Sequence, residues 1–470
     1  MAVYAVCLNP LLASPIAFAS LDAAVSLVET GRWQITHGAL YGDMDVALAG
    51  TTKVLGPPPG LALVLVPVYV LWRAAAGAVQ TLAGFQAFHA FATLTIGAAA
   101  SALAAGEVAA LAGWLGASRR GQCWAALLFA LGTPAFLFAT RLYKENLAAL
   151  LVIAAVRLAV VPGEAGRRAL AGALAGAAGL VAYPAGLIGP ALALLVGARE
   201  GVGRLTAVVL GGLAPAVALV LYNTALFGRP WRFAYGTYLN LPGGVPHTEM
   251  RLPRARVLLD SLVHQREGLL LYSPFLLLAI LGFALAWRAG KRGAVVVTVA
   301  FTLALWLLSA GWLAPYPGSF SGARYLFASV PLLAAFAGPA LEHLSARLRW
   351  LAGIGSVGMT YLAVQAGHIA DPAALAYAVK TFVSGWGLPV LFKETLPAWL
   401  GLETLHTAVS RPDVSAHDVL ISLASSSGWR LVLGQTVVLL LAAAVFGTMA
   451  LLIRRLWTPP PAALIAAPAR

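Results

Sequence analysis

The sequence has very few charged residues. Only 10% of its 470 residues are Asp, Glu, Lys or Arg, whereas 60% are hydrophobic. Soluble domains carry roughly a quarter charged residues, so water is not the main solvent of this chain. Apolar stretches at 203–226, 293–313 and 430–453 are each long enough to cross about 30 Å of hydrocarbon as helices. The composition therefore predicts an integral membrane protein and excludes a soluble globular one.

Two further patterns are missing. The sequence lacks the alternation of apolar and polar residues, in segments of about ten, that marks an outer-membrane barrel. Every backbone amide must pair internally in lipid, so we expect helices and an all-α, polytopic fold. Only two cysteines occur, Cys7 and Cys123, and both lie in apolar helical stretches, which argues against a disulfide framework.

The start of the chain lacks the basic residues of a signal peptide. No Lys or Arg precedes Arg32, although Ala17-Phe18-Ala19 has the form of a cleavage site. We therefore expect an uncleaved first helix, with a cleaved signal peptide as the alternative.

Basic residues outnumber acidic ones, and the net charge is +14. In a polytopic protein this excess indicates cytoplasmic loops rather than nucleic-acid binding. The basic residues gather at Arg119-Arg120, Arg167-Arg168, Arg199 with Arg204, Arg288 with Lys291-Arg292, Arg347 with Arg349, and Arg454-Arg455. Placing all six groups inside predicts both termini in the cytoplasm and about twelve transmembrane helices, at roughly 2–19, 87–115, 122–139, 145–162, 168–183, 184–198, 203–226, 268–288, 293–312, 323–341, 349–368 and 430–453.

The apolar stretch 61–77 does not fit this alternation. It is short for a span, it follows Pro57-Pro58-Pro59-Gly60, and counting it would place Arg119-Arg120 outside. We expect it to be a juxtamembrane or re-entrant helix within a first outer loop at 20–86. Most of the 17 acidic residues, and many Arg residues, then lie on the outer face. Because outer loops normally avoid Arg, these cations are expected to bind an anion, with ion pairs inside the loops as the alternative.

The first outer loop carries the most informative acids. Asp22 is predicted at the membrane boundary, at the start of a short surface helix that ends at Gly31. Partial desolvation there would raise the pKa of Asp22 toward that of a general base, and the alternative is a cap or anchor for the helix. Asp43 and Asp45 are close enough in sequence to share one divalent cation or one sugar ring.

Four segments between residues 20 and 335 carry motifs. They are the first loop with Asp22, Gly31-Arg32-Trp33, Lys53 and the prolines; Tyr222-Asn223 with Phe227-Gly228-Arg229-Pro230; Arg266-Glu267-Gly268-Leu269 with Tyr272-Ser273-Pro274; and Gly322-Ala323-Arg324-Tyr325-Leu326 with Pro331. In order and spacing these segments resemble the GT-C glycosyltransferases, which include the protein O-mannosyltransferases and the lipid A aminoarabinose transferases.

The resemblance implies a transferase that takes a sugar from a polyprenyl-phosphate donor at the extracytoplasmic face of a bacterial plasma membrane. The acceptor would be a lipid, a glycan or a protein. By position in the motifs, Asp22 matches the catalytic base, Asp45 falls near a second acidic position, and Arg324 matches the arginine of the last motif. Lys53 departs from the aminoarabinose-transferase pattern, because Val54-Leu55-Gly56 separate it from the prolines. We divide the chain into a GT-C-like catalytic module at 1–341, C-terminal helices at 342–455 with an outer segment at 369–429, and a cytoplasmic tail at 456–470. The tail is expected to be disordered because it is rich in Pro and Ala.

The chemistry of such a transfer needs few groups. Cations must hold the departing phosphate, and one carboxylate must take the proton of the acceptor hydroxyl. One base acting opposite the phosphate gives inversion at the sugar carbon. We assign the phosphate to Lys53, Arg141, Lys144, Arg266 and Arg324, catalysis to Asp22 and Asp45, and sugar or metal contacts to Asp43 and Tyr325. No cofactor is firmly predicted, although a divalent cation at Asp43 and Asp45 stays open. A transporter or flippase of lipid-linked saccharides is the alternative, but the sequence shows no internal repeat of the kind such proteins have.

Overall fold

The computed structural model describes residues 1–8, 15–43, 45–234, 237, 250–265, 268–312, 324–366, 379 and 382. Apart from residue 382, these belong to one compact unit, Met1–Val379, which is described by itself here. The predicted outer segment 369–429, the helix at 430–453, the tail at 456–470 and Arg266 lie outside the described residues.

The described chain is mostly helical. The α-helices are α1 (Ala2–Val6), α2 (Pro15–Thr30), α3 (Gly60–Ala76), α4 (Leu82–Ala92), α5 (Ala99–Leu115), α6 (Arg119–Gly132), α7 (Ala135–Ala139), α8 (Lys144–Val160), α9 (Ala165–Val181), α10 (Ile188–Glu200), α11 (Val202–Phe227), α12 (Ala255–Val263), α13 (Leu269–Tyr272), α14 (Leu278–Arg288), α15 (Arg292–Gly311), α16 (Val330–Glu342) and α17 (Ala346–Ala366). Short 3₁₀ segments are η1 (Gly38–Tyr41), η3 (Tyr183–Leu187), η6 (Pro274–Leu277) and η7 (Arg324–Ser329), and η2 (Thr93–Ala98) is a π-helical segment.

The first helices differ from the prediction. We expected one helix at 2–19 and a second beginning at Asp22, but α2 runs unbroken from Pro15 to Thr30 with Asp22 at its centre. The physical reason is that no glycine or further proline interrupts the stretch until Gly31, whose φ of +69° lets the chain leave the helix. Asp22 therefore caps no helix.

A small sheet was also missed. Strands β1 (Val46–Ala49) and β2 (Thr52–Leu55) form an antiparallel hairpin, with register from Val46 opposite Leu55 to Ala49 opposite Thr52. Gly50, with a φ of +63°, takes the left-handed conformation that the tight turn needs. The two four-residue strands are too short to give a clear alternating pattern in the sequence.

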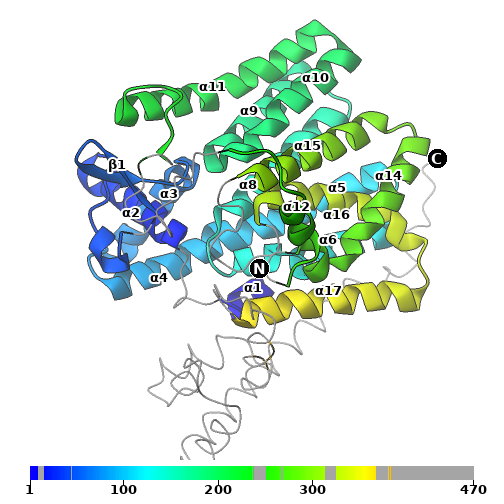
Figure 1. Cartoon of the computed structure of the whole chain (residues 1–470), viewed down its shortest axis with the longest axis horizontal. Helices are drawn as coiled ribbons and strands as arrows, with labels where there is room; N and C mark the ends of the chain where they lie inside the picture. The colour runs from blue at the N-terminus through cyan, green and yellow to red at the C-terminus, as the bar shows by residue number, and fades with distance from the viewer. Residues whose placement is uncertain are drawn as a thin grey trace, which may run out of the picture. The chain divides into compact units, whose positions relative to one another are not determined.

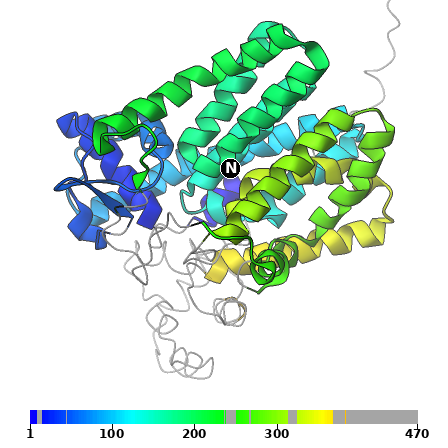
Figure 2. The same ribbon diagram turned by 45° about the horizontal axis from the view of Figure 1, so that its top comes forward.

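The helices pack closely through small residues. A Cβ on Gly172 of α9 would lie 1.9 Å from the carbonyl oxygen of Val208 in α11, and one on Gly211 would lie 1.8 Å from that of Ala169. Contacts of this kind are typical of helices packed in lipid. In Figures 1 and 2, α9, α10 and α11 lie side by side, and α2, α3 and the hairpin lie beside the end of α11 that carries Phe227.

Four described runs are long and apolar enough to cross a membrane, namely Gly84–Leu115, Val202–Phe227, Arg292–Gly311 and Arg324–Glu342. Gly60–Ala76 and Pro274–Arg288 are shorter apolar helices. The juxtamembrane or re-entrant place of α3 stays a prediction, because α8 has the same 17 residues, and so does the count of twelve spans.

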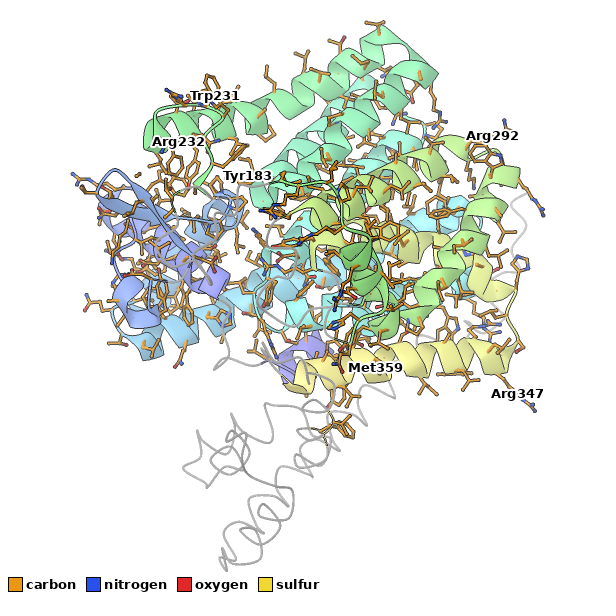
Figure 3. The ribbon with its side chains drawn as sticks, viewed as in Figure 1. Tyr183, Trp231, Arg232, Arg292, Arg347 and Met359 are labelled. Carbon is orange, nitrogen blue, oxygen red and sulfur yellow. The ribbon has the colours of Figure 1, made fainter. Side chains whose placement is uncertain are left out.

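Five of the six basic groups meet at one end of this bundle. Arg168 pairs with Glu200, Arg199 lies beside Gly293, Lys291 lies over the Trp114 ring at 4.9 Å, and Glu342 accepts from the Ser118 backbone N–H at 2.6 Å. These contacts join the turns that follow α5, α8, α10, α14 and α16. Figure 3 shows Arg292 and Arg347 at this end, and Trp231 and Arg232 at the opposite one. We call these ends the basic end and the loop end.

Candidate functional site

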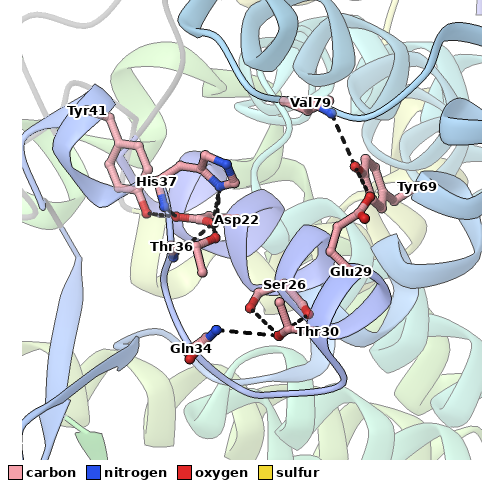
Figure 4. A network of polar contacts seen from close by, with 10 residues as sticks. All are labelled: Asp22, Ser26, Glu29, Thr30, Gln34, Thr36, His37, Tyr41, Tyr69 and Val79. Carbon is pink, nitrogen blue, oxygen red and sulfur yellow. Dashed lines mark hydrogen bonds and ion pairs between the residues drawn. The ribbon is translucent and has the colours of Figure 1, made fainter.

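Asp22 is the anchor of the first loop. Its side chain is 0% exposed, and its two oxygens accept hydrogen bonds from the Thr36 backbone N–H at 3.3 Å, the Thr36 hydroxyl at 3.1 Å, the His37 backbone N–H at 2.9 Å and the Tyr41 hydroxyl at 3.0 Å. The Nδ1 atom of His37 lies 3.1 Å from Asp22 Oδ1 as well. Figure 4 shows these partners converging on Asp22 from the segment that follows α2. The contacts tie residues 36–41 to the middle of α2.

Tyr41 connects this anchor with the other acids of the loop. Its ring stacks on Phe18 at a centroid distance of 5.6 Å. Burial, reinforced by the charges of Asp22, Asp43 and Asp45, raises the pKa of Tyr41 well above its usual value. The hydroxyl therefore stays protonated and donates to Asp22. The three predicted acids thus lie around one phenol.

Asp43 and Asp45 have different partners. Both have positive φ, +52° and +58°, although neither is glycine. The Asp43 carboxylate accepts from Lys53 at 2.6 Å, and Gly38 leaves the room for it, since a Cβ there would lie 2.0 Å from Asp43 Oδ1. Lys53, whose side chain is 43% exposed, is consequently an ion-pair partner of Asp43. Within the described ranges no three His, Cys, Asp or Glu side chains are grouped as metal ligands, and the divalent-cation hypothesis rests on Asp43 and Asp45 alone.

Asp45 belongs to a second group of charges, which we call the charged cluster: Asp45, Lys144, Glu145 and Arg324. Burial raises the pKa of Asp45 above its usual value and Glu145 adds to the effect, whereas Arg324 and Lys144 lower it. These opposing influences show that all four charges lie within electrostatic reach of one another. Two elements far apart in the sequence, α8 and η7, supply its cations.

Arg324 and Glu145 form the tight pair of this cluster. Arg324 Nε donates to Glu145 Oε1 at 2.6 Å, and both side chains are only 9% exposed. The guanidinium also lies over the ring of Tyr143, 5.4 Å from its centroid. Glu145 directly follows Lys144 in the sequence, but its close ion pair is with Arg324. The adjacent Tyr325 stacks on Trp312 at 5.1 Å.

Lys144 is placed by a strained turn. Leu142 is fully buried with a φ of +53°, a conformation that is uncommon for a branched residue. The turn starts α8 at Lys144, whose side chain is 7% exposed and makes no hydrogen bond with any residue that the structure describes. On the other side of the turn, Arg141 donates to the Val364 carbonyl of α17 at 3.2 Å, and its own carbonyl lies 3.2 Å from His89 Nε2. Two of the predicted phosphate cations, Lys144 and Arg324, therefore belong to the charged cluster with Asp45. The other two described ones have separate partners, since Lys53 pairs with Asp43 and Arg141 donates to α17.

The motif at Tyr222 holds the hairpin in place. Tyr222 donates to the Leu55 carbonyl at 3.3 Å, and its ring meets that of Trp33 edge to face at 4.9 Å. Asn223 donates to the Pro230 carbonyl at 2.9 Å, which fixes the exit from α11. Sequence reasoning missed this role, and it missed Thr36, His37 and Tyr41, because no spacing rule links them to their partners.

Comparison with known proteins bears on the fold. No protein-family model matches the sequence, and neither does any curated protein. Among solved structures, ArnT from Cupriavidus metallidurans in the apo state matches with a TM-score of 0.52 at 18% identity, over 93% of this chain and 72% of that one. This chain has the ArnT fold. The same protein bound to undecaprenyl phosphate matches with a TM-score of 0.51 at 17% identity, over 95% of this chain and 76% of that one. The predicted helical, polytopic fold is thereby confirmed.

Proposed function

We propose that this protein is a membrane glycosyltransferase that moves a sugar from a polyprenyl-phosphate donor to an acceptor hydroxyl. The observation that carries the proposal is the charged cluster, in which a buried lysine without a hydrogen-bond partner lies near Arg324 and the carboxylate of Asp45. Burying a lysine that makes no hydrogen bond is costly, and such a residue is typical of a ligand-binding site. That ArnT binds undecaprenyl phosphate on the same fold supports a polyprenyl phosphate as that ligand.

The transfer requires one displacement. Lys144 and Arg324 hold the phosphate and stabilise the negative charge that grows on it as its bond to the sugar carbon breaks. The acceptor oxygen forms a bond to the same carbon from the opposite side, which inverts its configuration. A carboxylate of the first loop takes the acceptor proton. No covalent intermediate with the protein is needed.

The direction of the site follows from charge. With the basic end in the cytoplasm, the charged cluster and the first loop face the extracytoplasmic side of a bacterial plasma membrane. The acceptor is then a lipid, a glycan or a protein that reaches this face. The described charges give no support to a transporter. The intramembrane Glu107 accepts a hydrogen bond from Arg157 Nη2 at 3.0 Å, whereas an acid on a transport path would be available to the substrate.

The test uses the full-length protein in lipid nanodiscs with polyprenyl-phosphate sugars that carry a radiolabel. Lys144→Gln should lower sugar release and transfer by about 100-fold or more, as loss of one charge-stabilising donor does elsewhere. The matched control is Lys291→Gln, which removes a lysine at the basic end and should leave the rate within about twofold. An unchanged rate in Lys144→Gln would refute the site. Movement of intact labelled donor across a vesicle membrane, with no transfer, would show a transporter instead.

A further inference from the structure

We infer that Asp45 is the residue that accepts the proton of the acceptor hydroxyl, and that Asp22 is a positioning residue for the loop that carries it. This inference rests on the proposed function. It departs from the assignment by motif, in which Asp22 matches the base, and it follows from how each carboxylate is bonded.

Asp22 has no free position for an acceptor. It is 0% exposed, and four donors from residues 36–41 already occupy its two oxygens. To bind Asp22, an acceptor hydroxyl would have to reach a carboxylate in the protein interior and displace one of these donors. Each displaced donor would then lose its own partner, at about 1–3 kcal/mol for a buried polar group.

The other acids nearby are also paired. Glu29 accepts from Tyr69 at 2.9 Å and lies 3.1 Å from Arg73 Nε, and Asp43 accepts from Lys53. Glu145 binds Arg324 at 2.6 Å. A carboxylate held by a cation in this way must give up that contact before it can bind an acceptor hydroxyl. Among the described acids of the first loop and the start of α8, Asp45 alone makes neither a hydrogen bond nor a close ion pair through its carboxylate.

The position of Asp45 suits a base. The residue is partly exposed, and no described residue bonds its carboxylate, so an acceptor can reach it. Its backbone is fixed, because its carbonyl accepts a hydrogen bond from the Gly56 N–H at 3.1 Å. This bond lies next to the first residue pair of the hairpin, Val46 with Leu55. Its carboxylate lies within electrostatic reach of Lys144 and Arg324, the two cations assigned to the phosphate.

Asp22 acts on Asp45 through the loop. It binds Tyr41, the last residue of η1, and Tyr41 lies close enough to Asp45 for the two to interact electrostatically. The Asp43 backbone N–H donates to the Gly38 carbonyl at 2.8 Å, which links the same turn to the residues before Asp45. Removal of Asp22 would therefore loosen the loop without removing the base.

The step balances as follows. The acceptor O–H proton passes to the Asp45 carboxylate, and the acceptor oxygen bonds to the sugar carbon. The bond from that carbon to the phosphate oxygen breaks, and its electron pair leaves with the polyprenyl phosphate between Lys144 and Arg324. Release of the proton from Asp45 to water restores the protein.

The experiment compares Asp45→Asn with Asp22→Asn in nanodiscs, with kcat, donor KM, the pH profile and the melting temperature measured on each. Asp45→Asn should lower kcat by about 10²- to 10⁴-fold, the usual contribution of a general base, with donor KM and melting temperature little changed and the acid limb of the pH profile lost. Asp22→Asn should lower the melting temperature and leave the acid limb in place. Because Asp22→Asn weakens the whole anchor of the loop, Tyr41→Phe tests the same link more mildly and should lower kcat only a few-fold.

An Asp45→Asn protein that keeps both its rate and its acid limb, while Asp22→Asn or Tyr41→Phe loses the acid limb, would overturn the assignment. Asp45→Glu should restore part of the rate if the carboxylate itself is required. If the wild-type protein transfers no sugar from any polyprenyl-phosphate donor, the proposed function fails, and this assignment fails with it. Transfer by the wild type together with a fully active Asp45→Asn rejects the assignment alone.

Discussion

The basic end and the loop end of the helical unit differ in the partners of their buried cationic side chains. At the basic end, Arg168 is 1% exposed and binds both oxygens of Glu200, one of them at 2.9 Å, while Glu342 accepts from the Ser118 backbone. At the loop end, Lys144 is almost as deeply buried and has no hydrogen-bond partner among the described residues. Paired charges at one end hold turns together. At the loop end Arg324 and Glu145 form a pair as well, but Lys144 beside them makes no hydrogen bond, and a ligand would explain its burial.

The contrast separates two roles for buried arginine. Arg168 supports a turn between helices, whereas Arg324 holds Glu145 and also lies beside Asp45. A structural cation should matter for unfolding only. A cation of the reaction should matter for the rate, even where its removal also weakens the fold.

The largest expected effect comes from comparing the two arginines. Arg324→Ala should lower kcat/KM by about 10²- to 10³-fold, because one cation of the phosphate site is lost. Arg168→Ala should leave kcat/KM within about twofold but lower the free energy of unfolding by about 2 kcal/mol, a value reduced because the Glu200 side chain is 25% exposed. Transfer assays and thermal unfolding on the same preparations check both. Equal losses of rate in the two variants would remove the distinction between the ends.

The next effect is on pH dependence. Burial raises the pKa of Asp45, so the wild-type rate should fall on acidification at a pH above the ordinary Asp pKa of about 4. Lys144 lowers this pKa and Glu145 raises it. Lys144→Gln should therefore move the acid limb of the residual activity to higher pH, and Glu145→Gln should move it to lower pH. Profiles of kcat/KM against pH measure the two shifts, and shifts of the same sign would show that another group titrates.

The same raised pKa bears on stability. Because the folded-state pKa of Asp45 lies above its unfolded value, its protonation favours the folded state at low pH, and this contribution is lost as the pH rises through the folded-state pKa. Burial of the Asp45 charge therefore weakens the fold near neutral pH. Replacing this charge by a neutral amide in Asp45→Asn should therefore not lower the melting temperature, in contrast to Asp22→Asn.

Much of the helical framework could be predicted from the sequence. The predicted helices at 145–162, 203–226 and 293–312 match α8, α11 and α15 within two residues at each end. Each is a continuous apolar run bounded by polar or basic residues, so length and hydropathy alone define it. The continuity of α2 through Asp22 could not be predicted, because a membrane boundary does not by itself end a helix.

The site was only partly predictable. The residue types were informative, since Asp45, Lys144 and Arg324 were all proposed from the sequence and lie together. The hydrogen bonds of these residues could not be predicted, because Arg324 and Glu145 are 179 residues apart and only the fold brings them into contact. Asp22 was identified by position in a motif, and its partners Thr36, His37 and Tyr41 become visible only when the loop folds back onto α2.

The smallest expected effect concerns the anchor between α11 and the hairpin. Tyr222→Phe removes one hydrogen bond to the Leu55 carbonyl, and it should lower the free energy of unfolding by about 0.5–1.5 kcal/mol. Leu55 pairs with Val46, the residue after Asp45, so a looser hairpin should lower kcat a few-fold and leave donor KM nearly unchanged. Thermal unfolding and steady-state transfer measure this, with Tyr272→Phe as a control that removes a hydroxyl bonded to the Gln265 carbonyl, away from the hairpin. If Tyr222→Phe lowers kcat as much as Asp45→Asn, the base is held chiefly by α11, and the contacts of Asp22 are secondary in placing it.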